Sequence, residues 1–211
     1  MFINEKVTDY INVVDSINPT PGGGSVIALV GAVASSLARM YGHLTFDKKA
    51  YAKHDLETRD SFEQSFNQLL AIKEKMIVAI DEDAIVYTKV IQAYRLPKET
   101  NEEMDARLVA IQVATLAAIS VPQKVMVAAY DGLCLLEHLI PFGNKNAVSD
   151  IIIAIHLFAC VVECSIINMK INIAALTDEA KANQYNAEIE CLLTNTLTKK
   201  ELLIELSNQF L

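Results

Sequence analysis

Glycine and proline are scarce in this chain, with 7 and 5 residues among 211. Because these two residues interrupt regular structure most strongly, their scarcity favours long helices. Hydrophobic residues make up 52% of the sequence and charged residues 21%, a balance that supports a large packed core and excludes an intrinsically disordered chain. No linker, repeat or low-complexity segment divides the sequence, so we expect a single domain over residues 1–211.

Basic clusters and metal motifs are also missing. The net charge is −8, and no Lys/Arg cluster is interleaved with aromatic residues, so we expect no binding of nucleic acid. The four histidines form neither HxxxH nor HExxH, and the four cysteines contain no CxxC pair. We therefore expect no metal site and interpret the cysteines as small buried hydrophobic residues in a reducing compartment.

Targeting signals and long apolar runs are absent as well. The N-terminal sequence MFINEKVTDY has no basic flank followed by an apolar run, so we expect no signal peptide. The most apolar runs, at 26–40 and 151–162, are shorter than the ~20 residues that span a bilayer. These absences predict a cytoplasmic protein that does not contact a membrane.

Apolar residues recur with a helical period, and no segment alternates as a half-buried strand does. The pattern predicts an all-α fold, a bundle of about six or seven helices. Pro122 is expected to kink or break its helix, and Thr100 or Asn101 to cap the start of that helix. We expect helices at about 4–16, 56–94 and 147–176. Three further helices are expected, from the end of the turn at 18–25 to about 45, from 101 onward, and from 178 to the end.

One carboxylate interrupts an apolar stripe on the long 56–94 helix. Positions seven apart nearly superimpose on a helix, and one such row contains Leu69, Met76, Asp83 and Val90. Asp83 is therefore predicted to point inward, whereas Asp81 falls in a polar row and is predicted to face solvent. An inward carboxylate is costly unless it is paired or functional. Asp83 is therefore either a buried carboxylate satisfied by an Arg, a Lys or backbone donors, or part of a site.

A glycine-rich turn and a pair of asparagines form two further polar features. Gly22, Gly23, Gly24 and Ser25 open a helix whose free N–H groups can hold an anion, although the same residues can serve as a simple turn and cap. On the 147–176 helix, one otherwise apolar face carries polar residues one turn apart, which either line a site or bond neighbouring helices. These residues are Ser165, Asn168 and Asn172.

Five motifs occur in an order that is specific when taken together. They are PTPGGGSVIAL at 19–29, DEDA at 81–84, AYRLPK at 93–98, GNKNAVSD at 143–150 and NMKIN at 168–172. With these motifs the chain resembles the formiminotetrahydrofolate cyclodeaminase family, which includes methenyltetrahydrofolate cyclohydrolase members. In animal relatives the domain is fused to a formiminotransferase domain, which has no counterpart here.

The resemblance implies an all-α homodimer with a folate site lined by the glycine-rich turn, with Gly22, Gly23, Gly24 and Ser25, and by neighbouring helices. It assigns the catalytic role to the second acid of the D-x-D-A motif, Asp83, and matches Asn168 and Asn172 to the paired asparagines of the family. Asn168, Asn172 and Ser25 are candidates to orient the pterin by hydrogen bonds. Tyr87 lies one turn from Asp83 and is a candidate for substrate contact or core packing.

Arg95 or Lys98 is expected to meet the glutamate tail of the substrate, and a plain surface role for both is equally open. Tyr41 stands where relatives carry a smaller or branched apolar residue, which affects the expected pocket shape.

The implied reaction closes a ring: N10 of the folate attacks the formimino carbon on N5 and ammonia leaves, giving 5,10-methenyltetrahydrofolate. One carboxyl group of raised pKa can take the N10 proton and return a proton to the leaving amine, so neither a metal nor a redox cofactor is expected. The alternative is a methenyltetrahydrofolate cyclohydrolase, which adds water to the same carbon and yields 10-formyltetrahydrofolate. A less favoured alternative is a non-catalytic helical folate-binding or scaffold protein.

Overall fold

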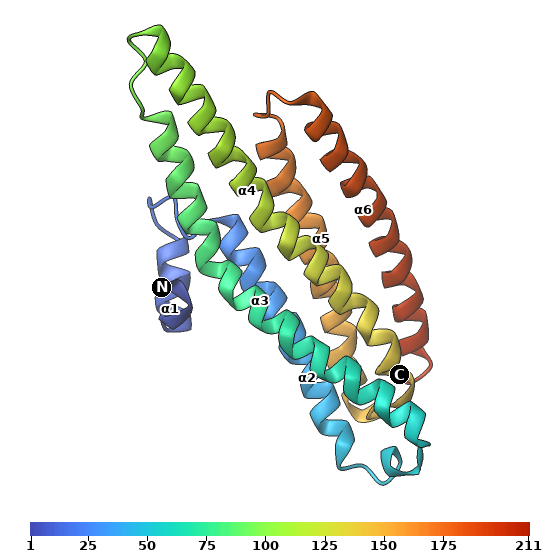
Figure 1. The fold of residues 1–211 in the computed structure, drawn as a ribbon. Helices are drawn as coiled ribbons and strands as arrows, with labels where there is room; N and C mark the ends of the chain where they lie inside the picture. The colour runs from blue at the N-terminus through green and yellow to red at the C-terminus, as the bar shows by residue number, and fades with distance from the viewer.

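The structure is a computed structural model that describes all 211 residues, and it contains helices and no strands (Figure 1). The predicted all-α fold is therefore confirmed. Two short elements come first, a 3-10 turn at Phe2–Asn4 and α1 at Val7–Val14. The long helices are α2 (Gly23–Phe46), α3 (Leu56–Tyr94), α4 (Asn101–Leu135), α5 (Val148–Ile173) and α6 (Glu179–Asn208).

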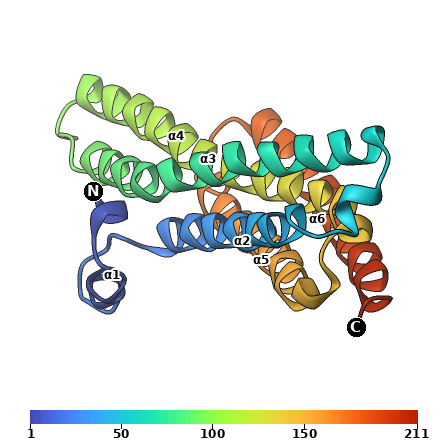
Figure 2. The same cartoon turned by 90° about the horizontal axis from the view of Figure 1, so that it is seen from below.

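Four of these helices form the central bundle. Helix α2 packs against α3 and α5, and α4 packs against the same two helices, so the four close a ring around the core. Helix α6 lies outside this ring against α5 and, to a lesser extent, α4 (Figure 1). Helix α1 projects from the bundle near the beginning of α2 (Figure 2). One cluster of 37 buried hydrophobic residues runs through the molecule, so α1, the ring and α6 share one core.

Small residues along α2 allow α3 to pack closely against it. Ala28, Ala34 and Ala38 are completely buried, and a Cβ added to Gly31 would lie 2.8 Å from Sδ of Met76 on α3. Met76 is itself completely buried. Because interiors are packed as densely as organic crystals, the missing side chain at residue 31 is what makes room for the thioether. Helix α2 is thus a central helix of the bundle.

Helix ends are fixed by local hydrogen bonds. Asp55 caps α3 by accepting the N–H of Thr58, at 2.7 Å. The predicted cap at Thr100 is present as a reciprocal capping box with Glu103 at the start of α4. Predicted and observed bounds of the long helices agree closely. The exception is the first prediction, since 4–16 is split into the 3-10 turn and the shorter α1.

Of the kink or break predicted at Pro122, the break is wrong, and the kink stays a prediction. Helix α4 continues through Pro122 to Leu135, although proline lacks the N–H of a normal helical residue. Pro122 is buried, as are its neighbours Val121 and Val125, and helices α3 and α5 flank α4 along its length. Tertiary packing therefore holds the helix together where the backbone loses one hydrogen bond.

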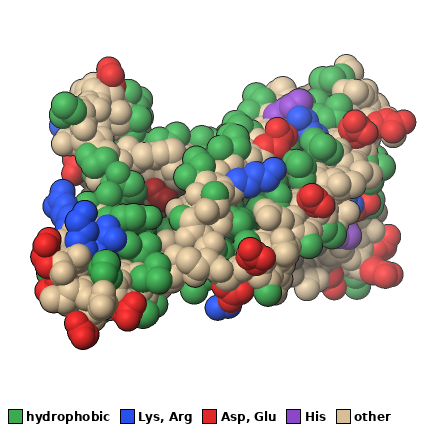
Figure 3. All heavy atoms as spheres, turned by 90° about the horizontal axis from the view of Figure 1, so that it is seen from above, with side chains coloured by type: hydrophobic (Ala, Val, Ile, Leu, Met, Phe, Trp, Pro, Cys, Tyr) green, Lys and Arg blue, Asp and Glu red, His purple; other side chains and the backbone are tan.

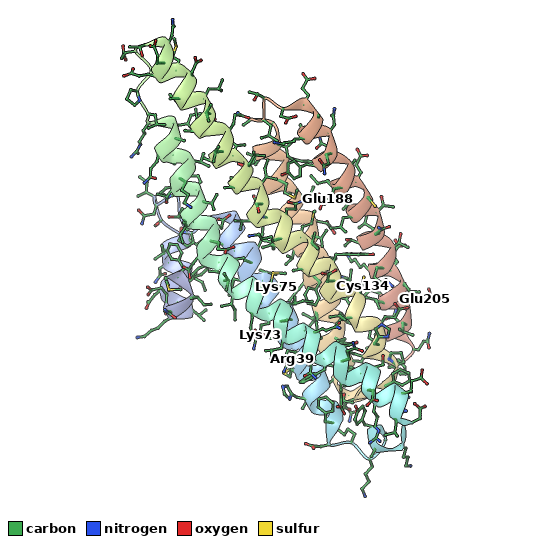
Figure 4. The ribbon with its side chains drawn as sticks, in the orientation of Figure 1. Arg39, Lys73, Lys75, Cys134, Glu188 and Glu205 are labelled. Carbon is green, nitrogen blue, oxygen red and sulfur yellow. The ribbon has the colours of Figure 1, made fainter.

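Helix α6 is attached to the ring by polar contacts as well as apolar ones. Nε2 of Gln123 on α4 donates to Oε2 of Glu188 on α6 at 2.7 Å, and Glu188 is labelled on α6 in Figure 4. Nearer the other end of α6, Nζ of Lys199 lies 2.8 Å from Oε2 of Glu137. These bonds tie α6 to α4 and to the 3-10 turn at Leu136–His138 that follows it.

Two expectations from the sequence need correction. Three stretches, Gly23–Phe46, Asn101–Phe142 and Lys145–Ile173, are long and apolar enough to cross a membrane by length and composition. Counting only uninterrupted apolar runs missed them, because a helix with one or two charges still qualifies; the absence of membrane contact stays a prediction.

The expected burial of the cysteines also needs correction. Cys160 and Cys191 are exposed rather than buried, since both lie on outward faces of helices.

Candidate functional site

A cavity of about 300 Å³ lies where the beginning of α2 meets α3, α4 and the end of α5. Its lining brings together residues that are far apart in the sequence, from Pro19 to Asn172. Seven of the ten predicted site residues line it: Gly22, Gly23, Gly24, Asp83, Tyr87, Asn168 and Asn172. The structure thus gathers three separate sequence motifs, the glycine-rich turn, the D-x-D-A motif and the paired asparagines, around one space.

Asp83 forms the polar centre of this cavity. Its carboxylate, half-buried on α3, accepts the backbone N–H of Ser25 through Oδ2 at 3.1 Å. Ser25 is in the first turn of α2, and the N-cap residue Gly22 supplies no side-chain cap. Asp83 therefore caps α2 from a different helix and lies at the positive end of its dipole. Burial raises the pKa of Asp83, and the bond from Ser25 lowers it by less.

Gly24 is the residue that lets the carboxylate reach the helix end. A Cβ added at Gly24 would overlap all the carboxyl atoms of Asp83. At the neighbouring Gly23 the nearest atom to an added Cβ is Oδ1 of Asn168, at an ordinary contact distance of 3.8 Å. The two adjacent glycines thus have different roles, because only Gly24 is in direct steric contact with Asp83.

Ser25 acts on Asp83 rather than on the cavity. It is completely buried and is absent from the cavity lining. Its hydroxyl lies 2.9 Å from the hydroxyl of Tyr10 on α1, so one residue holds Asp83 through its N–H and α1 through its side chain. Burial is the largest cause of the raised pKa of Tyr10, and Asp83 and Asp81 add to it. Sequence patterns gave no sign of Tyr10, which is in a short helix separate from every motif.

Asp81 does not face solvent, and that prediction is wrong. Its Oδ1 accepts the backbone N–H of Phe2 at 2.6 Å, and its Oδ2 is buried without a partner. The reason is that the N-terminal turn folds back over α3 and covers the face that the helical row left open. Asp81 therefore holds the N-terminal turn, while Asp83, two residues later, faces the cavity.

The side-chain amide of Asn172 is held by backbone carbonyls. Nδ2 of Asn172 donates to the backbone carbonyl of Asn168 at 2.8 Å and lies 3.5 Å from the carbonyl of Ala118 on α4. A narrow gap behind the cavity, lined by Gly24, Asp83, Pro122, Asn168 and Ser165 among others, has no room for a water molecule. Oγ of Ser165 is buried there and has no hydrogen-bond partner.

Three sequence features lie away from the cavity. Arg95 caps the end of α3 and Lys98 follows in the connection to α4; both are exposed and neither lines the cavity. At 1.5 Å per residue, Arg95 is about 18 Å along the helix from Asp83. Lys and Arg side chains gather at this end of the molecule (Figure 3). Tyr41 is at the opposite end of α2, where its hydroxyl donates to the carbonyl of Ile140, so it leaves the cavity shape unchanged.

Two larger hollows lie elsewhere on the molecule. One of about 630 Å³ separates α1 from α2 and α3, and nine of its eleven lining residues are hydrophobic. The other, of about 750 Å³, follows the outer groove between α3 and α4. Neither contains a buried carboxylate with a raised pKa, whereas the smaller cavity does. No three His, Cys, Asp or Glu side chains gather to hold a metal ion, and the absence of a cofactor stays a prediction.

Gly24→Ala is expected to destabilise the protein by ~1–3 kcal/mol, because the added methyl group displaces the Asp83 carboxylate from the end of α2. Gly23→Ala is the matched control. It is expected to remain within ~0.5 kcal/mol of wild type, since its Cβ meets only ordinary contacts. Urea unfolding of the two variants measures the contrast, and equal stabilities would show that the approach of Asp83 to Gly24 is not tight.

Asp83→Asn is expected to increase the free energy of unfolding at about pH 7.5, because it removes a half-buried charge while keeping an oxygen for the Ser25 N–H. The folded-state pKa of Asp83 is raised, so wild type regains stability relative to the variant as the pH falls through that value. The difference should therefore shrink by about pH 4.

Asp55→Asn provides a control of opposite sign. The N–H of Thr58 lowers the pKa of Asp55, so wild type should lose stability relative to this variant as the pH falls. Urea unfolding at both pH values checks the two slopes, and slopes of the same sign would contradict the assignment.

Comparison with known proteins agrees with this architecture. Residues 6–191 match the family model described as formiminotransferase-cyclodeaminase. The methenyltetrahydrofolate cyclohydrolase of Methylorubrum extorquens is 30% identical over 202 residues, covering 96% of this chain and 95% of its own. The formimidoyltransferase-cyclodeaminase of Mus musculus is 26% identical, and the match covers 96% of this chain but 37% of the mouse protein. The crystal structure of formiminotetrahydrofolate cyclodeaminase from Thermotoga maritima superimposes with a TM-score of 0.78 at 27% identity, covering 99% and 96% of the two chains. The chain therefore belongs to the formiminotransferase-cyclodeaminase family.

Proposed function

We propose that this protein converts 5-formiminotetrahydrofolate to 5,10-methenyltetrahydrofolate with release of ammonia. The observation that carries the proposal is the half-buried Asp83 carboxylate, whose pKa is raised and which faces a cavity lined by the glycine-rich turn and two asparagines. The fold matches that of formiminotetrahydrofolate cyclodeaminase from Thermotoga maritima over 99% of the chain, at 27% sequence identity, which supports the same chemistry.

Asp83 serves as both base and acid in the proposed reaction. N10 attacks the carbon of the protonated formimino group, and the carboxylate takes the N10 proton as the new C–N bond forms. The resulting carboxylic acid gives that proton to the amino group, which leaves as ammonia when the C–N bond breaks. A pKa moved towards neutrality suits a group that must hold and release a proton in one cycle. Ser25 is a positioning residue, since its N–H fixes the carboxylate.

Other cavity residues are assigned to substrate binding. Asn168 and Asn172 face the cavity from α5, and Tyr87 faces it from α3, one turn beyond Asp83. We assign the exposed Arg95 and Lys98 to the glutamate tail of a substrate that extends along α3 towards the exposed end of that helix. The reaction proposed needs no metal or redox cofactor, and we propose that it takes place in the cytoplasm.

A methenyltetrahydrofolate cyclohydrolase activity is the second candidate, and one observation favours it. Adding water to the methenyl carbon requires a positioned water molecule, which needs two or more polar partners. Asp83, Asn168 and Asn172 line the cavity of about 300 Å³ and supply such polar partners. The relative from Methylorubrum extorquens, matched over nearly its full length, bears that name.

We also propose that the protein is a symmetric homodimer. Large hydrophobic side chains remain exposed on the projecting α1 and on α3: Val7 by 74%, Ile11 by 57%, Val78 by 56% and Ile85 by 55%. Exposed apolar area beyond a few scattered side chains marks an interaction surface. An isologous interface between two copies would cover such faces on both partners at once.

Asp83→Asn is expected to lower kcat by ~10²-fold or more, because the amide cannot accept or return the N10 proton. Asp81→Asn is the matched control on the same helix. It keeps an oxygen for the Phe2 N–H and is expected to lose about threefold or less, the scale of one hydrogen bond. Steady-state rates of both variants test the assignment, which an equal loss in the two would refute.

The choice of reaction is tested by giving purified protein each folate in turn. With 5-formiminotetrahydrofolate we expect release of ammonia in step with growth of the methenyl chromophore, because ring closure produces both. Loss of the methenyl chromophore faster than the spontaneous rate, without turnover of the formimino substrate, would instead establish the cyclohydrolase. The Asp83→Asn variant is the control for both assays.

Multi-angle light scattering is expected to give twice the chain mass at micromolar concentration, since the exposed apolar faces need a partner. Replacing Ile11 on α1 with Asp is expected to shift the protein towards monomer, because a charge cannot be buried unpaired in an apolar contact. A stable wild-type monomer at this concentration would contradict the dimer.

A further inference from the structure

Pro122 alters the hydrogen bonding of α4 at the wall of the cavity. In a regular helix the N–H of residue 122 would donate to the carbonyl of residue 118, and proline has no N–H to give. Ala118 and Pro122 both line the cavity, and Ala118 is only partly buried. The proline therefore leaves an acceptor in the wall of a site whose lining at this point is otherwise apolar.

Asn172 places a second acceptor beside this carbonyl. Its Nδ2 lies 3.5 Å from the Ala118 oxygen and 2.8 Å from the Asn168 oxygen, and this pair of contacts assigns the amide orientation. Oδ1 of Asn172 accepts no hydrogen bond in the structure and is the free end of the amide. A carbonyl oxygen has two lone pairs, and a contact at 3.5 Å is at the limit of hydrogen bonding, so Ala118 keeps its capacity to accept.

We propose that the Ala118 carbonyl and Oδ1 of Asn172 form an acceptor pair that binds the N–H edge of the substrate's pterin ring. That edge presents two adjacent donors, the ring N3–H and the 2-amino group. The inference rests on the proposed function, because it names how a tetrahydrofolate substrate is held in this cavity.

The demands of the reaction support this division of roles. Asp83 is the only carboxylate among the residues that line the cavity. If it bound the two donors of the pterin ring, it would not be free to move protons at N10. A ring with donor groups still needs acceptors, because buried N–H groups left unpaired cost binding energy. The acceptor pair meets that need from α4 and α5 and leaves Asp83, on α3, for the chemistry.

The size of the cavity agrees with this placement. A volume of about 300 Å³ is at the lower end of the range for small-molecule sites. It therefore suits one end of the substrate rather than the whole of it. Exposed Arg95 and Lys98 lie towards the end of α3, beyond the cavity, so the ring end is the part assigned to the enclosed space.

The test uses Pro122→Ala, which restores the N–H that occupies the Ala118 carbonyl. The probes are 5-formyltetrahydrofolate, in which oxygen replaces the formimino nitrogen, and its 2-desamino analogue, with Kd measured by calorimetry. Wild type is expected to bind the desamino analogue about tenfold more weakly than the parent, the scale of one buried hydrogen bond. In Pro122→Ala the ratio of the two dissociation constants, desamino analogue over parent, should fall to about twofold or less. The affinity should be lost only for the parent compound.

Asn172→Ala provides an independent variant that does not depend on refolding α4. Its ratio should also fall, by about threefold or more, because half of the acceptor pair is missing. Asn195→Ala, on the exposed side of α6, is the control and should keep the wild-type ratio. Circular dichroism confirms that each variant is folded before binding is measured.

The outcomes separate this inference from the proposed function. An unchanged ratio in Asn172→Ala, or in folded Pro122→Ala, would overturn the acceptor pair while leaving the reaction intact. A wild-type protein that turns over 5-formiminotetrahydrofolate but does not distinguish the two probes would do the same. A wild-type protein that neither binds nor converts any of these folates would overturn the proposed function and the acceptor pair together.

Discussion

The bond from the Ser25 N–H to the Asp83 carboxylate is the contact on which the site depends. It joins the first turn of α2 to the middle of α3, and it exists only because Gly24 leaves room for the carboxyl group. The bond and the helix dipole favour the ionised form, whereas burial favours the neutral form and is the larger influence on the pKa. An ordinary capping residue at Gly22 would satisfy α2 by itself. Asp83 would then lose its hydrogen-bond donor and keep only the effect of burial. One contact would no longer fix both the position of its carboxylate and its pKa.

The N-terminal residues form a second layer behind this contact. The hydroxyl of Tyr10 on α1 bonds the hydroxyl of Ser25, and the N–H of Phe2 bonds Asp81. Two carboxylates only two residues apart therefore hold two different backbone segments, and α3 connects them. Asp81 contributes to the position of the N-terminal turn, while Asp83 faces the cavity. The two neighbouring acids on one helix therefore differ in their contacts, and the chemical role that we propose for Asp83 does not extend to Asp81.

Much of this arrangement could be predicted from the sequence, because helical periodicity is local. The rows that placed Asp83 inward and the cap at Thr100 depend only on neighbours along the chain, and the structure has that cap. Asp81 was misplaced because the residue that covers it, Phe2, is 79 positions away and belongs to a 3-10 turn without periodicity. Tyr10 was missed for the same reason. Ser165 was visible as a polar residue on an apolar face, but its lack of a partner depends on four helices meeting.

Pro122 shows how a departure from local rules can mark a functional position. Local reasoning places a break at a buried proline, yet the packing of α4 between α3 and α5 holds the helix continuous. The energetic cost of the missing bond is then borne at one carbonyl, and that carbonyl lies in the wall of the cavity rather than in the apolar core. The carbonyl of Ala118 is partly buried and meets only the long 3.5 Å contact from Nδ2 of Asn172, so it can accept a stronger hydrogen bond from water or a ligand. The position of the cost and the position of the site therefore coincide, as expected where a ligand rather than the fold completes the hydrogen bonding.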